Sequence, residues 1–92
     1  MKKIDFRKIE VKNVEGNPQE FDLDYKSFAN YMYFNAESVD HIEISREINK
    51  GGEIQCDAEK ASAIKKYAEI YFKAFVLEAL NPVLDEIINP KK

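Results

Sequence analysis

The sequence predicts a small α+β domain in which helices cover one face of a short antiparallel sheet. Apolar residues alternate near the N-terminus, as in β-strands, and recur at helical spacing from residue 25 onward. Turn-forming residues separate these regions, and 92 residues correspond to one domain. We therefore expect residues 1–92 to fold as a single domain that ends in a solvated tail at 89–92.

The N-terminal segment predicts a β-hairpin. Apolar and polar residues alternate along it, with a one-residue shift at Arg7-Lys8 that requires a bulge or a bend. The turn formers Gly16-Asn17-Pro18 then lead into a second alternating run. We predict strands at roughly 4–14 and 18–23.

Two short helices are expected next. Asp24 is a good N-cap for a helix from Tyr25, which Asn35 can close in the left-handed conformation. Ser38 can cap a second helix that ends at Gly51-Gly52. Isoleucines in this second segment fit both strand alternation and helical spacing, and its length and capping favour the helix.

The C-terminal half predicts a long amphipathic helix. Residues 53–56 alternate and are compatible with a short third strand, and Asp57 is the expected N-cap of the helix that follows. An apolar stripe runs along this helix as far as Leu80. Because proline removes a backbone donor, we expect the helix to break at Asn81-Pro82 and a new one to begin there.

Two groups of apolar side chains are candidates for binding a partner. Tyr33 and Phe34 point away from the inward stripe of the first helix, unless the following loop folds over them. The second group follows Pro82 and must pack either on its own domain, which is the default, or on a second copy. Its members are Val83, Leu84, Ile87 and Ile88.

Catalytic and ligand-binding sites have little support in the sequence. His41 is the only histidine, and the simpler interpretation is a surface side chain. Cys56 precedes a helix start, as reactive cysteines can, but its place in an alternating run favours the core. No spacing of ligands or glycine-rich loop indicates a metal or cofactor. We therefore predict no catalytic, metal or cofactor-binding residues, with an enzyme or small-ligand binder that uses Cys56 or His41 as the alternative.

Charge and composition limit the classes of partner. The formal net charge is −3, and neither half is basic, so nucleic acid is disfavoured. A second alternative is a nucleic-acid regulator that uses the lysine-bearing helix face of Lys60, Lys65, Lys66 and Lys73. The first residues form no apolar signal region, and no run approaches the roughly 20 apolar residues of a membrane span. We expect a cytoplasmic protein with a reduced cysteine and no membrane contact.

The order of these segments resembles a group of known proteins. The stretch from Met1 to Val11, the Glu-Gly turn, the polar-aromatic helix, and the residues 47–54 and 57–61 are similar to short uncharacterised proteins encoded in prophages and mobile elements of gut bacteria. The resemblance implies a bacterial cytoplasmic or virion-associated role, as in phage assembly, and implies no catalytic residues. Taken together, we expect a non-enzymatic protein-interaction or assembly module, with self-association as one option.

Overall fold

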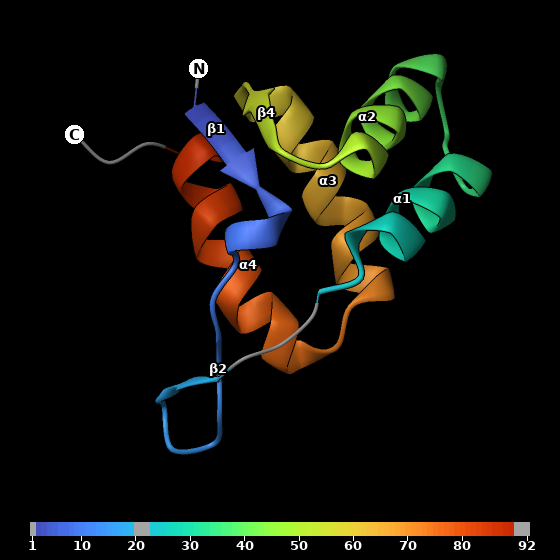
Figure 1. Cartoon of the computed structure of the whole chain (residues 1–92). Helices are drawn as coiled ribbons and strands as arrows, with labels where there is room; N and C mark the ends of the chain where they lie inside the picture. Colours follow the sequence, from blue (N-terminus) through green and yellow to red (C-terminus); the bar gives the residue numbers. More distant parts are fainter. Residues whose placement is uncertain (1, 20–22, 90–92) are drawn as a thin grey trace.

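The computed structural model describes residues 2–19 and 23–89, which form an α+β fold (Figure 1). The strands are β1 (Lys2–Asp5), β2 (Val11–Lys12), β3 (Pro18–Gln19) and β4 (Glu53–Cys56). The helices are α1 (Tyr25–Phe34), α2 (Val39–Lys50), α3 (Ala58–Tyr71) and α4 (Ala74–Ile88), with a 3-10 turn at Phe6–Lys8. The predicted fold class is confirmed.

The strands pair differently from the predicted hairpin. In the described part of the chain, β2 and β3 form a hairpin, and β1 pairs antiparallel with β4, with Ile4 opposite Ile54. The predicted third strand at 53–56 is therefore confirmed, whereas the expected first hairpin strand at 4–14 is divided into β1, the 3-10 turn and β2. Residues 20–22, within the predicted returning strand, lie outside the described part of the chain.

The 3-10 turn explains why the first strand leaves the sheet. The Asp5 carboxylate accepts the Arg7 backbone N–H at 2.9 Å and two guanidinium bonds at 3.0 and 3.1 Å. The side-chain hydrogen bond from Arg7 is the main reason that the pKa of Asp5 lies below its usual value. These Asp5–Arg7 hydrogen bonds stabilise a turn where the alternation of apolar residues shifts. The bend expected at Arg7-Lys8 is therefore a turn between the β1–β4 sheet and the β2–β3 hairpin.

Helices α1 and α2 begin at their predicted caps. The Asp24 carboxylate accepts the Ser27 N–H at 3.0 Å, and the Ser38 hydroxyl accepts the His41 N–H at 3.3 Å. The helical interpretation of the second segment is thus confirmed. Asn35 ends α1 as expected, but not in the left-handed conformation, since its φ is −111°. Its side-chain amide donates to the Tyr31 carbonyl at 2.9 Å, which satisfies the helix end without a positive φ.

The predicted break at Asn81-Pro82 is wrong. The chain bends instead at Phe72, whose φ of −87° and ψ of 152° are extended, and α4 continues through Pro82. One helix over 58–88 would be about 46 Å long, and it would exceed the 40 Å longest dimension of the molecule. Folding it back lets α3 and α4 pack on each other and on the core. Pro82 has no N–H to donate to the Glu78 carbonyl, one turn earlier in the helix. Both residues are exposed, so water can bind that carbonyl in place of the missing donor, and the proline is tolerated.

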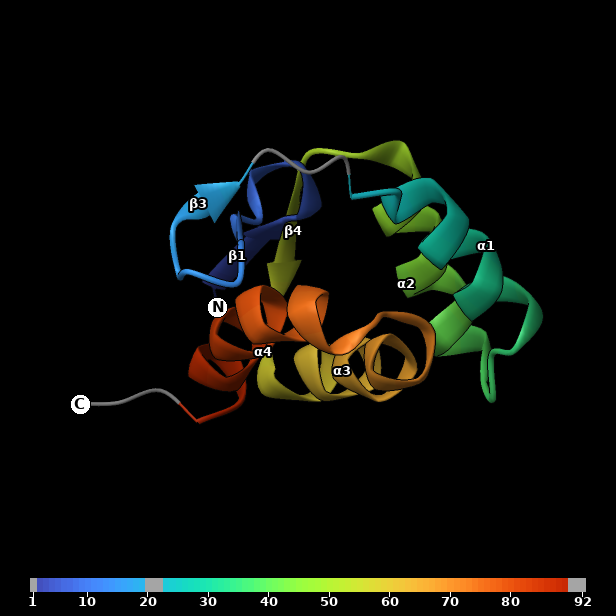
Figure 2. The ribbon, with the colours of Figure 1, turned by 90° about the horizontal axis from the view of Figure 1, so that it is seen from below.

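The core lies between two layers (Figure 2). Helices α3 and α4 form one layer, and the β1–β4 sheet and the α1–α2 pair lie side by side in the other. Every α-helix contributes fully buried side chains, as do β1 and β4; the largest are Phe28, Ile4, Met32, Ile48, Ile64, Leu80 and Leu84. Of the predicted tail at 89–92, only Asn89 is described, and it is exposed. None of the described helices combines the length and the apolar character needed to cross a bilayer.

Candidate interaction surface

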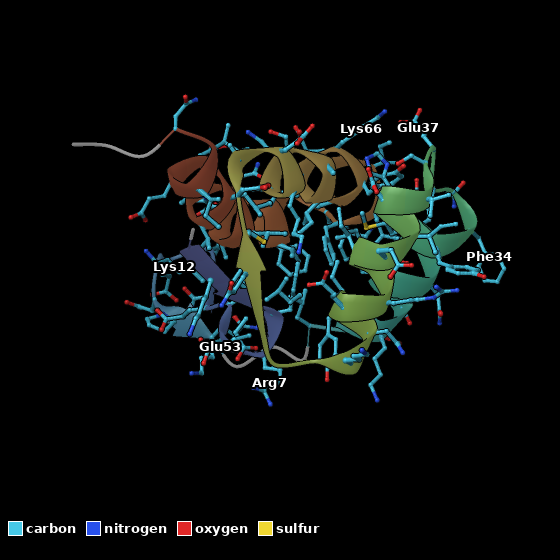
Figure 3. All side chains as sticks on the ribbon, turned by 90° about the horizontal axis from the view of Figure 1, so that it is seen from above. Arg7, Lys12, Phe34, Glu37, Glu53 and Lys66 are labelled. Atoms are coloured by element: carbon cyan, nitrogen blue, oxygen red, sulfur yellow. The ribbon has the colours of Figure 1, made fainter. Side chains whose placement is uncertain are left out.

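Two aromatic rings stand exposed at the end of α1. Phe34 is 81% exposed and Tyr33 is 40% exposed, so the following loop does not cover them. Phe34 points away from the body of the molecule (Figure 3). The two rings meet edge to face, with centroids 5.2 Å apart and an interplanar angle of 86°. Because Asn35 closes the helix directly after them, the pair stands on a fixed backbone.

Beside these rings, a surface hollow of about 240 Å³ lies between α1 and α2. Its floor consists of two small buried residues, Ala29 and Ser45. The Ser45 hydroxyl donates to the Ile42 carbonyl at 2.6 Å, so its proton is already used within the helix. The floor therefore suits an apolar group. The full lining is Ala29, Asn30, Tyr33, Ser45, Arg46, Asn49 and Lys50.

The rim of the hollow is polar and cationic. The Arg46 guanidinium lies 5.8 Å from the centre of the Tyr33 ring, a cation–π arrangement, and pairs with Glu43 at 3.3 Å. Lys50 adds a second cation, and no carboxylate is among the described residues that line the hollow. We call the rings of Tyr33 and Phe34 together with this hollow the α1–α2 surface.

A buried tyrosine anchors this helix pair to α3. The Tyr67 hydroxyl accepts the Glu37 backbone N–H at 2.9 Å and lies 2.9 Å from His41 Nδ1. The Tyr67 hydroxyl thus links the Glu37 backbone to the His41 ring. His41 is therefore a half-buried structural partner rather than the surface residue expected from the sequence. Tyr67 lies three residues after Ile64, and this helical spacing is the sequence signal for its place on the buried face of α3.

Cys56 lies in the core, as the favoured interpretation predicted. It is 0% exposed, and burial raises the pKa of its thiol to about 11. At neutral pH the thiol keeps its proton, and the side chain has no exposed surface in the folded chain. This arrangement does not provide the accessible thiolate that nucleophilic chemistry needs.

The lysines of α3 hold neighbouring elements together. Lys60 binds Glu47 and the Gln55 carbonyl, each at 3.1 Å, and Lys65 binds Asp85 of α4 at 2.6 Å. Lys66 pairs with Glu37, and the two lie next to each other in Figure 3. This hydrogen bond raises the pKa of Lys66 and lowers that of Glu37. These three lysines are engaged within the chain, which weakens the nucleic-acid alternative.

The second candidate group packs within its own chain. Leu84 and Ile87 are buried in the core, and Val83 and Ile88 are half-buried against it. The default expectation for residues 82–88, packing on their own domain, is thus what the structure has. All four belong to α4, which lies away from the C-terminal end of α1 (Figure 1). They do not extend the α1–α2 surface.

Two further observations bear on the class of protein. Among residues 2–19 and 23–89, no three His, Cys, Asp or Glu side chains gather in a way that could hold a metal ion. Comparison with known protein families, with curated proteins and with solved structures gives no match for this chain. The geometry of the chain's own residues is therefore the basis for assigning a function.

Proposed function

We propose that the protein is a non-enzymatic interaction module that binds a protein partner on the α1–α2 surface. The observation that carries this proposal is the exposed Tyr33–Phe34 pair at the end of α1, beside a hollow that Arg46 borders. Tyrosine, phenylalanine and arginine are enriched at protein interfaces, and tyrosine and arginine among the side chains that dominate their binding energy. Water meets most of the Phe34 ring in the free protein, so covering it would release binding energy.

The size of the hollow supports a peptide anchor over a cofactor. Small-molecule sites have volumes of roughly 300–1,000 Å³, whereas this hollow has about 240 Å³. It is also open at the surface, between two helices that are joined by a short loop. A single large apolar side chain of a partner fits such a site.

The biological setting stays a prediction. The resemblance to proteins of prophages and mobile elements favours a role in assembling a larger particle, and the α1–α2 surface would supply the contact. Binding at this surface does not depend on that setting, so it can be tested with the purified protein alone.

Selection from a displayed library of random 12-residue peptides tests the proposal. The immobilised parent protein should enrich peptides that bind it and that lose binding to Phe34→Ser. Val14→Ser is the matched control, because Val14 is fully exposed in the β2–β3 turn, away from α1 (Figure 1). The proposal is overturned if no peptide is enriched, or if the enriched peptides bind the Phe34 variant as tightly as the parent.

A further inference from the structure

We infer that the partner of the α1–α2 surface is an acidic segment that places one large apolar side chain in the hollow. This inference rests on the proposed function and adds the chemistry of the partner. It follows from the positive charges around the hollow, from its apolar floor and from the concave shape of the acidic face between α2 and α3.

The charge around the hollow is opposite to that of the whole chain. The formal net charge of the protein is −3, yet Arg46 and Lys50 border the hollow with no carboxylate in its described lining. Lys26 is exposed one helical turn before Asn30 and adds positive charge on the same side of α1. Complementary charge favours association and selects among partners. A segment that carries Asp or Glu meets attraction here, and a basic segment meets repulsion.

The polar groups of the rim can also order a peptide backbone. Asn30 and Asn49 are exposed on opposite sides of the hollow, and each side-chain amide has donors and an acceptor. The floor between them is Ala29 and the self-satisfied Ser45, which offer contact without hydrogen bonds. This pattern, an apolar centre with a polar and cationic rim, matches an acidic peptide with one apolar anchor.

Glu43 sets the strength of this site. Its carboxylate pairs with Arg46 at 3.3 Å, so an incoming carboxylate competes with it for the guanidinium. Both side chains of this pair are more than half exposed, so the pair is weak and can rearrange. Removing the Glu43 charge should therefore strengthen the binding of an acidic segment.

A second copy of the chain is the rival occupant, because the protein has an acidic face of its own. A hollow between α2 and α3 is lined by one cation, Lys60, which pairs with Glu47, and by the carboxylates of Asp40, Glu43, Glu47, Asp57 and Glu59. Its apolar members, Ile44 and Ala63, are buried or half-buried within it and do not protrude. Two concave surfaces cannot fill each other, and the exposed Val39 beside this face is smaller than the large apolar side chain that the α1–α2 hollow accommodates.

The test uses three synthetic nine-residue peptides with capped ends and one central phenylalanine. The flanking residues are all Glu in the first peptide, all Ser in the second and all Lys in the third. Each is titrated into ¹⁵N-labelled protein, and amide shifts of α1 and α2 report binding at the surface. We expect the Glu peptide to bind roughly two- to thirty-fold more tightly than the Ser peptide, as two exposed charge pairs allow, and the Lys peptide to bind least.

Variants of exposed residues sharpen the result. Arg46→Gln and Lys50→Gln should each reduce the preference for the Glu peptide, and Glu43→Gln should increase it. Raising the salt to 0.5 M should also shrink the preference, because exposed charges are screened over a few ångströms there.

The outcomes separate the two proposals. Equal binding of the Glu and Ser peptides, or tighter binding of the Lys peptide, overturns the acidic partner and leaves the interaction surface standing. No shift at α1 and α2 with any peptide overturns both. If the shifts of the free protein at this surface change with its own concentration, a second copy occupies it and the inference of an acidic segment is overturned.

Discussion

Replacing Tyr67 with phenylalanine should loosen the α1–α2 pair from α3. The substitution keeps the ring, which is 3% exposed, and removes only the hydroxyl. The Glu37 N–H and His41 Nδ1 then lose the partner that each has at 2.9 Å. The contact between the Tyr67 and His41 rings, with centroids 5.4 Å apart, is retained. The change therefore isolates the two hydrogen bonds.

The expected loss is about 1–2 kcal/mol of unfolding free energy. A hydrogen bond contributes roughly 0.5–1.5 kcal/mol net, and a buried group left unpaired costs more. Glu37 is exposed and His41 only half-buried, so water can partly replace the lost hydroxyl as their hydrogen-bond partner. The expected loss therefore stays near the net value of the hydrogen bonds and below the cost of fully buried unpaired groups. For a domain of this size, such a loss lowers Tm by about 4–16 °C.

Urea unfolding followed by circular dichroism measures this loss. Tyr33→Phe is the control, because its hydroxyl is on an exposed side chain and its removal should change stability by less than about 0.5 kcal/mol. A double-mutant cycle with His41→Ala should give a coupling of at least about 0.5 kcal/mol with Tyr67→Phe. A Tyr67→Phe loss no larger than that of the control, or a coupling of zero, would refute the role assigned to the hydroxyl.

Three other experiments test separate features of the fold. The pKa of Cys56 is about 11 in the folded chain against 9.0 for a free thiol, so its contribution is complete below pH 9 and is lost as the pH rises toward 11. The stability advantage of the parent over Cys56→Ala should therefore shrink by about 2 kcal/mol between pH 8 and pH 10.5 in urea unfolding, and a constant advantage contradicts this. Pro82→Ala restores a helix hydrogen bond and should raise stability by about 1–2 kcal/mol in thermal unfolding; a loss would mean that α4 depends on the proline. Gly51 and Gly16 both have positive φ, of 77° and 87°, but an added Cβ at Gly51 would lie 2.9 Å from the Tyr25 hydroxyl, whereas at Gly16 it meets nothing within 4 Å. Gly16→Ala should cost about 1 kcal/mol and Gly51→Ala clearly more in the same assay; equal costs would show that Tyr25 moves aside freely.

Local chemistry was the most predictable part of this protein. Asp24, Ser38 and Asp57 each cap the helix that follows, as expected, because a cap depends only on a side chain and the backbone within three residues of it. The sequence left open whether the loop after α1 covers Phe34, and the structure shows that it does not. The hollow beside it was not foreseen, because its two walls come from different helices.

The breaks and pairings were less predictable. Pro82 is the strongest helix breaker by local preference, yet α4 passes through it, because the buried residues Leu80 and Leu84 on either side hold the helix against the core. The actual bend at Phe72 has no local breaker. Its ring lies 4.8 Å from that of Phe28 on α1, a contact that exists only in the folded chain.

The amino-acid sequence by itself determined the α+β class, the starts of α1, α2 and α3 and the burial of Cys56, since these follow from periodicity and capping over a few residues. Only the tertiary structure decided that β1 pairs with β4, that α3 and α4 fold back on each other, and that Tyr67 joins His41 to Glu37. Each of these joins residues far apart in the chain. Their energies come from packing that exists only once the layers have met, so no short window of sequence contains them.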